Sequence, residues 1–434
     1  IFFKAQKILE VSEGSLPVSI FAWLIGGLIM LVCAYAFSGL AARYEKVNGI
    51  VDYAEAIVGP RYAYLLNWFM LTIYYPSMTS VLAWHSANYL CSLFGAAADS
   101  GACLALSCFF LCGSYAVNAL SPKIAGKLQV STTVIKLIPL VAVGVIGTVM
   151  GLLNGTIAQN FSSAAYSADF SAGGALFTSV CATAFAYEGW IIATTINAEL
   201  RDAKRTLPKA LLGGSLIVVG VYILYNVGLF GVVDKSVIYQ NGTTPAFTRL
   251  FGSVGGTLVS VLVVISCLGT LNGLMLACTR GLYSIAARDL GPKPQIFRQV
   301  DAATNMPNNS AVVALVLCAF WMLYYFGAEL AGTPWFGFFS FDSSELPIIT
   351  IYGGYLPIFV FTMLRGKDMH PFRRYGVSAA AILCCLFMML AAVVSHGITV
   401  VGYLCLFAVV MAIGAFFGKK RPGAKEAPIP KDAV

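Results

Sequence analysis

Runs of about 20 apolar residues recur along the chain, and short polar segments separate them. A helix needs about 20 such residues to cross the hydrocarbon core of a bilayer, where every backbone polar group must be bonded within the protein. Hydrophobic residues make up 59% of the 434 positions and charged residues only 11%, which excludes a soluble domain. The sequence therefore predicts an all-α integral membrane protein.

The apolar runs predict eleven complete spans. They lie at 16–43, 62–93, 103–118, 129–153, 172–198, 208–233, 252–280, 309–325, 343–364, 375–395 and 399–417. Residues 1–9 read as the outer half of a broken helix, because the chain opens on apolar residues without Met or a charged leader. We therefore expect a preceding segment and twelve spans in the intact protein.

Basic residues are concentrated in alternate loops and in the tail after Gly418. Most of the 27 Lys and Arg lie in these segments, whereas the opposite loops carry mainly Asp and Glu. The positive-inside rule then places both termini in the cytoplasm. The net charge of +8 reports this topology, since a nucleic-acid site would gather the bases on one soluble face.

Cysteines fall mostly within the spans and lack paired metal-ligand spacing. Cys91 and Cys103 lie near the outer ends of consecutive spans, where a disulfide or two free thiols are both open, and we favour free thiols.

Span spacing indicates an internal repeat. Adding about 187 residues to 16–43 and 62–93 gives positions close to the spans at 208–233 and 252–280. Five spans per unit is an odd number, so the second unit enters the membrane inverted. We assign 1–153 to the first repeat, 172–364 to the second, 375–417 to two additional helices and 418–434 to a cytoplasmic tail.

Two short segments are too polar to span. Residues 51–64 are expected to lie along the cytoplasmic surface, and 243–252 are their counterpart on the opposite side.

The segment FAYEGW at 185–190 places Glu188 and Gly189 inside an apolar span. A charge facing lipid costs roughly 2.5 to 3.5 kcal/mol, so Glu188 must face protein or water. A helix broken here would expose amide groups and carbonyls suited to a zwitterionic amino acid. Glu188 could instead be a structural partner that shapes the break.

Lys136 lies about 10 Å into its span at 1.5 Å per residue. Its ammonium could replace a bound cation by joining the first broken helix to hydroxyls such as those of Ser266 and Thr270. The alternatives are that Lys136 snorkels to the cytoplasm and that the small residues of SCLGTLNG at 266–273 serve packing alone.

Several stretches together resemble the L-type amino acid transporter family of the amino acid, polyamine and organocation superfamily. They are IFFKAQKILE at the start, YYPSMTSVLAWHSANYL at 74–90, IKLIPL at 135–140, FAYEGW, RTLPKAL at 205–211 and SCLGTLNG. The resemblance covers nearly the whole chain and implies a leucine-transporter-type fold with five-plus-five inverted repeats.

The resemblance also implies residue roles. The substrate carboxylate would bind backbone just before Ile1, and its amine would bind carbonyls near Phe185, Ala186 and Glu188, with Phe185 as an aromatic gate. Lys136 matches the lysine that stands where sodium-coupled relatives bind sodium, and Tyr222 matches a family tyrosine. The remaining expected pocket residues are Tyr74, Met78, Tyr187 and Gly189.

The chain departs from many animal members of that family. Glu188 stands where they have glycine, Ile191 where they have asparagine, and Met78 where some have serine. Animal members bind a glycoprotein subunit through a cysteine that has no obvious equivalent here. We therefore expect a bacterial-type member without that subunit.

These observations predict a sodium-independent exchanger of small neutral amino acids such as alanine, serine and cysteine, without a cofactor. A proton-coupled symporter of the same fold is the alternative. A channel would need a continuous polar stripe, and an enzyme would need clustered reactive residues within the bilayer.

Overall fold

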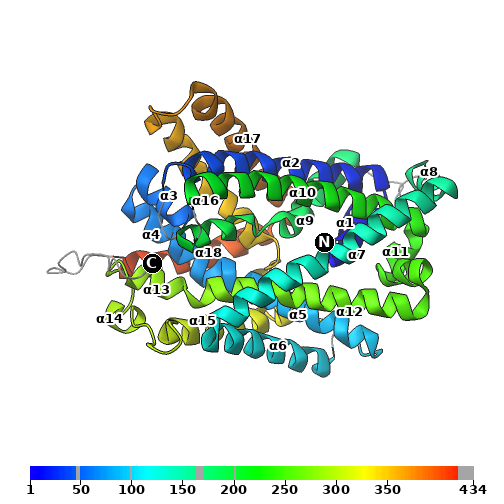
Figure 1. Cartoon of the computed structure of the whole chain (residues 1–434), viewed down its shortest axis with the longest axis horizontal. Helices are drawn as coiled ribbons and strands as arrows, with labels where there is room; N and C mark the ends of the chain where they lie inside the picture. The colour runs from blue at the N-terminus through cyan, green and yellow to red at the C-terminus, as the bar shows by residue number, and fades with distance from the viewer. Residues whose placement is uncertain (45–48, 98–99, 163–170, 200–201, 419–434) are drawn as a thin grey trace.

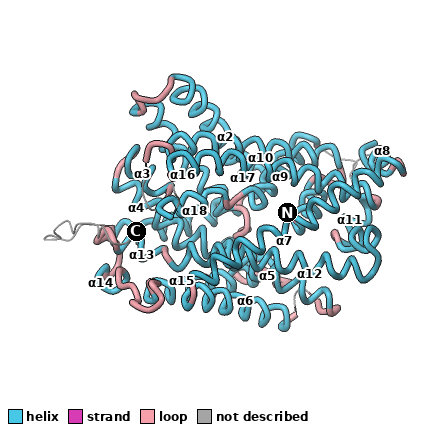
Figure 2. The backbone as a smooth tube through the Cα atoms, viewed as in Figure 1, coloured by secondary structure: helices cyan, strands magenta, loops and turns pink. Residues whose placement is uncertain are grey.

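The computed structural model describes residues 1–44, 49–97, 100–162, 171–199 and 202–418, and this part of the chain contains no strand. Figure 2 shows helices joined by short loops throughout the described chain. Four long helices, α2, α7, α10 and α12, run along the long axis of the molecule in Figure 1.

The first half of the chain contains α1 to α8. The bounds are Phe2–Val11 (α1), Leu16–Ala41 (α2), Ile50–Ile57 (α3), Pro60–Phe69 (α4), Tyr75–Leu93 (α5), Gly101–Leu120 (α6), Pro122–Leu153 (α7) and Thr156–Ser162 (α8). A π-helical turn over Met70–Tyr74 joins α4 to α5, so the three form one continuous rod.

The second half contains the remaining helices. They are Ala172–Tyr187 (α9), Ala203–Val232 (α10), Lys235–Asn241 (α11), Thr244–Thr279 (α12), Gly281–Ala286 (α13), Pro294–Phe297 (α14), Asn308–Tyr325 (α15), Leu346–Arg365 (α16), Ser378–His396 (α17) and Thr399–Phe417 (α18). Short 3-10 segments cover Trp190–Glu199 and Gly337–Phe339, and π-helical turns cover Phe326–Leu330 and Phe372–Val377.

Ten helices of the described chain are long and apolar enough to cross a membrane. The rod from α4 to α5 is a further long helix, and the short helix α1 is the segment that was assigned to a twelfth span from the sequence. The chain is thus a multi-pass membrane protein. The short helices α3, α13 and α14 lie at one end of the molecule, here called the α3 end, and α8 and α11 lie at the other, the α11 end (Figure 1).

Two predicted boundaries were wrong. The span expected from 129 begins at Pro122, where the Ser121 hydroxyl caps the first turn, so the basic residues that suggested a loop belong to a helix longer than the bilayer core. The span expected from 208 begins earlier, at Ala203. The start expected at 252 agrees with the kink at Gly252 (φ 73°), which separates the span from a short helix that begins at Thr244.

The segment expected to lie along the cytoplasmic surface is shorter and more enclosed than predicted. Helix α3 ends at Ile57, and Gly59 with φ 142° separates it from the α4 rod. Most of α3 is buried, including Asp52 at 2% exposure, because Arg288 bonds to its carboxylate. The ion pair with Arg288 satisfies the buried carboxylate of Asp52 within this segment.

The predicted break in the span at 172–198 is confirmed. Helix α9 ends at Tyr187, Glu188 is extended with φ −79° and ψ 164°, and Gly189 has φ 103°. A left-handed φ favours glycine because a side chain there is strained. The chain then continues as the 3-10 segment from Trp190.

Glycines allow α7 and α10 to approach closely. A Cβ on Gly228 would lie 2.4 Å from the Val143 carbonyl oxygen and 2.6 Å from Gly144 Cα. A Cβ on Gly147 would lie 2.3 Å from the Gly228 carbonyl oxygen. Such small-residue contacts support helix association where no hydrophobic drive exists between helices.

Replacing Gly228 with Leu is therefore expected to lower both the midpoint of thermal unfolding in detergent and the yield of monodisperse protein. Overpacking of this kind typically lowers the free energy of unfolding by about 1–3 kcal/mol. Gly220→Leu is the matched control, because the same helix is exposed there and a Cβ meets nothing within 4 Å. Equal behaviour of the two variants would contradict the close-packing account.

Candidate functional site

The break after α9 holds a buried carboxylate. Glu188 Oε1 accepts a hydrogen bond from the Tyr74 hydroxyl at 2.6 Å, and Tyr74 lies in the π-helical turn before α5. Among the described residues, Glu188 Oε2 is buried without a hydrogen-bond partner. The bond joins the broken helix to the α4 rod and leaves one acceptor oxygen of Glu188 available.

Tyr187 points away from Tyr74, contrary to the expectation that both would add bulk to one pocket. Its hydroxyl donates to the Trp23 carbonyl oxygen at 2.8 Å, and its ring centroid lies 5.4 Å from that of Tyr222. Tyr222 also makes an edge contact with Trp23 at 5.9 Å. Tyr187, the last residue of α9, therefore packs against Trp23 of α2 and Tyr222 of α10.

An aromatic stack lies beside the break. His85 of α5 stacks on Phe3 of α1 with ring centroids 3.6 Å apart, and Phe3 meets Phe185 edge-on at 5.5 Å. Phe185 is 7% exposed, and the Lys4 ammonium lies 5.4 Å from its ring centroid. Sequence reasoning named Phe185 alone, but Phe3 lies between it and His85.

The other predicted pocket residues surround this region. Met78 is 4% exposed in α5 and belongs to the same apolar cluster as Phe185 and Tyr74. Ile1 caps α1 and, like the half-buried Ala186, packs against the cluster of Tyr187 and Trp23. Gly189 faces open space, since an added Cβ would meet nothing within 4 Å.

Lys136 extends toward α12. Its ammonium donates to Thr270 Oγ1 at 3.4 Å, and the Thr270 hydroxyl in turn donates to the Ser266 carbonyl oxygen at 3.1 Å. A lysine held within the bundle does not match the snorkelling alternative. No hydrogen bond from Lys136 to α1 is present in the described part of the chain.

The glycines of the same stretch serve close packing, as the alternative reading held. A Cβ on Gly269 would lie 2.1 Å from Thr132 Oγ1, and one on Gly273 would lie 3.0 Å from Gln129 Oε1. Close approach of α7 and α12 brings Lys136 within reach of Thr270, so the packing and the polar contact depend on each other.

Sequence reasoning missed a buried ion pair. Lys4 Nζ lies 2.7 Å from Glu345 Oε1, and their side chains are 5% and 4% exposed. His396 Nε2 lies 3.2 Å from Glu345 Oε2. A lysine in an apolar half-helix was the available signal, but its partner is 341 residues away.

A second ion pair was also missed. Arg288, after α13, donates to Asp52 Oδ1 of α3 at 2.5 Å and lies 3.7 Å from Glu55 Oε2. This pair lies at the α3 end of the molecule (Figure 1).

A cavity of about 280 Å³ opens between α1, α5 and the turn joining α11 to α12. Phe3 and His85 are among its lining residues, so the aromatic stack forms part of its wall. Part of the cavity wall is polar and is formed by Gln6, Lys7, Glu10 and Asn88.

A helix interrupted within its span, with the short helix α1 packed against it, is typical of secondary transporters. The solved structure of MhsT in complex with L-phenylalanine has the same fold, with a TM-score of 0.55 and 14% identity over 90% of this chain and 94% of MhsT. The chain therefore has a leucine-transporter-type fold.

A model of the amino acid permease family matches residues 1–418, and the chain belongs to that family. The serine/threonine exchanger SteT of Bacillus subtilis is 29% identical over 87% of this chain and 82% of SteT. The human cystine/glutamate transporter is 26% identical over 89% and 75%, respectively. The protein is thus an amino acid transporter rather than an enzyme, within the superfamily that the resemblance indicated.

Proposed function

We propose that this chain is a sodium-independent exchanger of small neutral L-amino acids that works by alternating access. The observation that carries the proposal is the break at Glu188 and Gly189 beside the start of α1. Unwound backbone at this position offers amide donors and carbonyl acceptors to a zwitterion. The similarity to SteT, a serine/threonine exchanger, supports exchange and a small cargo.

Sodium independence is proposed from Lys136. An ammonium within hydrogen-bonding distance of Thr270 supplies a fixed positive charge where a bound cation would otherwise be needed. The substrate would contact Ile1, Phe185, Ala186, Glu188 and Gly189, with Tyr74 and Met78 on the facing rod. Tyr187 and Tyr222 would support the site through α2 and α10 instead of lining it.

Topology follows from charge. We propose that the α3 end is cytoplasmic, that the α11 end is extracellular, and that both termini are cytoplasmic. Residues 1–153 and 172–364 would be the two inverted repeats, and the transporter would work without a glycoprotein subunit. The cavity beside Phe3 is then the outer vestibule.

In this transport cycle, the two ion pairs would act as gates on opposite sides of the substrate site. Lys4 with Glu345 joins α1 to α16, and Arg288 with Asp52 joins α13 to α3. The first pair would separate when the site opens outward, and the second when it opens inward.

The test is transport in proteoliposomes preloaded with unlabelled serine. Uptake of labelled alanine should rise when the vesicles are preloaded and should not change when potassium replaces sodium. Uptake into empty vesicles driven by a sodium gradient would contradict sodium independence. Absence of trans-stimulation would contradict exchange.

Proton symport is retained as the second candidate because Glu188 has one buried oxygen without a partner among the described residues. Uptake into empty vesicles driven by a proton gradient would select it. Glu188→Gln should then abolish gradient-driven uptake while counterflow persists. If the protein is an exchanger, a proton gradient should not drive uptake into empty vesicles, and Glu188→Gln should not separate gradient-driven uptake from counterflow.

Met78→Ala is expected to admit larger substrates, because shortening a buried side chain enlarges the proposed pocket wall. A change of this size should shift discrimination between alanine and larger amino acids by about 1–3 kcal/mol, so the cutoff should be graded. Competition by leucine, phenylalanine and tryptophan against labelled alanine measures it. An unchanged profile with intact transport would place Met78 outside the site.

A further inference from the structure

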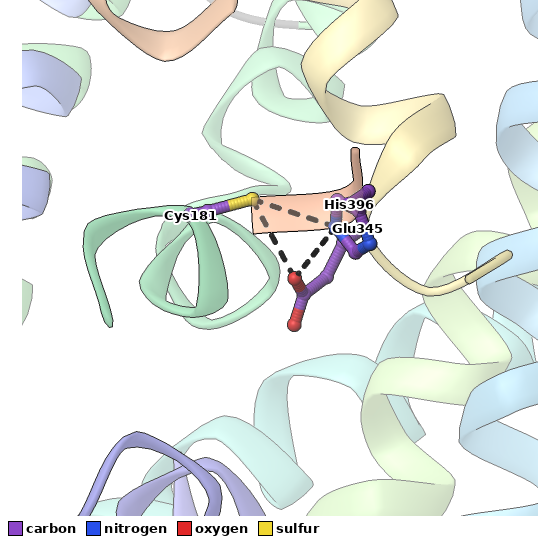
Figure 3. A group of neighbouring side chains, drawn as sticks. All are labelled: Cys181, Glu345 and His396. Carbon is purple, nitrogen blue, oxygen red and sulfur yellow. Dashed lines mark hydrogen bonds and ion pairs between the residues drawn. The ribbon is translucent and has the colours of Figure 1, made fainter. Parts of the chain in front are cut away.

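Three side chains that can ligate a metal converge from three separate segments. Cys181 belongs to α9, Glu345 immediately precedes α16, and His396 is the last residue of α17 (Figure 3). Their ligand atoms all lie within 4.8 Å of one another. Cys181 and Glu345 are buried, and the His396 side chain is 12% exposed.

The spacing of the three ligand atoms matches a zinc site. Cys181 Sγ lies 3.5 Å from Glu345 Oε2 and 3.7 Å from His396 Nε2, and the last two atoms are 3.2 Å apart. With Zn–S near 2.3 Å, Zn–N near 2.0–2.1 Å and Zn–O near 2.0–2.2 Å, a tetrahedron has ligand-to-ligand edges of about 3.4–3.6 Å. The observed distances agree with these edges to about 0.2 Å.

The carboxylate is positioned by contacts that a metal would not disturb. The backbone N–H of Glu345 donates to Asp342 Oδ1 at 3.0 Å, and the Ser344 N–H donates to the same oxygen at 2.7 Å. Lys4 occupies only Oε1, at 2.7 Å. Glu345 Oε2 is therefore directed at the thiol and the imidazole while Lys4 remains bound.

We propose that Cys181, Glu345 and His396 form an inhibitory binding site for a thiophilic divalent cation, with Zn²⁺ as the type ion. Binding forms a Zn–S bond as the Cys181 thiol loses its proton to solvent, and the neutral imidazole and the carboxylate each supply a lone pair. Water or a halide fills the fourth position. The thiolate and the carboxylate supply two negative charges, and a halide in the fourth position would balance the remaining positive charge, that of the Lys4 ammonium.

Such an ion would hold three helices together. It would connect α9, the helix that ends at the broken segment, to the start of α16 and the end of α17. Since alternating access requires α9 to move against its neighbours, a bound ion would stop the cycle. Only this inhibition rests on the proposed transport function, and metal binding itself does not.

Binding is tested first, on the purified full chain in detergent. Isothermal titration with Zn²⁺ should show one site per chain, and Co²⁺ should produce a thiolate-to-metal charge-transfer absorption. Cys181→Ala and His396→Gln should each weaken Zn²⁺ binding at least about tenfold and remove the Co²⁺ band. Cys33→Ala is the matched control, because Cys33 is equally buried on α2 away from the cluster.

Inhibition is tested next, by exchange in proteoliposomes with each variant normalised to its own metal-free rate. Zn²⁺ should inhibit the unaltered protein and the Cys33→Ala variant, and should lose its effect on Cys181→Ala. Binding without inhibition would overturn the inhibitory role, and unaltered binding by Cys181→Ala would overturn the site. If Cys181→Ala is not monodisperse, Cys181→Ser replaces it. Absence of exchange in the unaltered protein would count against the proposed function, while the titration would still decide the site.

Discussion

Lys4→Met is expected to lower the free energy of unfolding by about 3–5 kcal/mol, because it leaves the buried Glu345 carboxylate without its ammonium partner. His396 Nε2 also lies 3.2 Å from Glu345 Oε2. A protonated His396 would partly replace the lost ammonium, so under conditions where the imidazole is charged the loss of unfolding free energy should lie at the lower end of this range. Thermal unfolding followed by tryptophan fluorescence in detergent should show the fall as a reduced midpoint.

A double-variant cycle separates this pairing from simple loss of side-chain packing. Lys4→Met combined with Glu345→Gln removes both charges, so it should recover most of the stability lost in the single variant. Lys7→Met is the matched control, because Lys7 lies on the same helix with an exposed side chain. A double variant no more stable than Lys4→Met would show that the pair is not the source of the loss.

Lys136→Met is expected to reduce exchange about 10- to 100-fold. A hydrogen bond to a charged group contributes about 1.5–3 kcal/mol, and the substitution removes both the charge and the bond to Thr270 while retaining an apolar stem. Trans-stimulated uptake of labelled alanine, corrected for the amount of reconstituted protein, measures the change.

Two controls accompany the Lys136 variant. Lys136→Arg keeps a positive charge and should retain more exchange than Lys136→Met. Lys127→Met changes an exposed lysine of the same helix and should leave the rate unchanged. Full activity of Lys136→Met in sodium-free buffer would refute the proposed role of its charge.

Hydropathy alone predicted most of the spans correctly, because the bilayer requires long apolar helices whatever their partners. The break near Glu188 was equally readable, since a carboxylate and a glycine are both costly within a lipid-facing helix. Boundaries were less accurate where a helix extends beyond the apolar core, as α7 does from Pro122. Local composition does not show how far such an extension continues.

The direction of individual side chains could not be read from the sequence. Tyr187 adjoins Glu188, yet it turns toward Trp23, while Tyr74 reaches Glu188 from another helix. The direction in which a side chain points depends on how its helix is rotated about its own axis relative to the neighbouring helices. Close glycine contacts, such as that of Gly269 with Thr132, set this rotation only in the assembled bundle.

The sequence by itself determined that this protein crosses a membrane many times, that one helix is interrupted at Glu188, and that its segments resemble amino acid transporters. Tertiary structure decided which distant residues meet. Lys4 and Cys181 lie within apolar segments, Glu345 and His396 lie at the ends of two others, and nothing in the sequence alone connects the four. Burial removes water from these groups, so they must bond to one another, and only the packing of α1, α9, α16 and α17 brings them together.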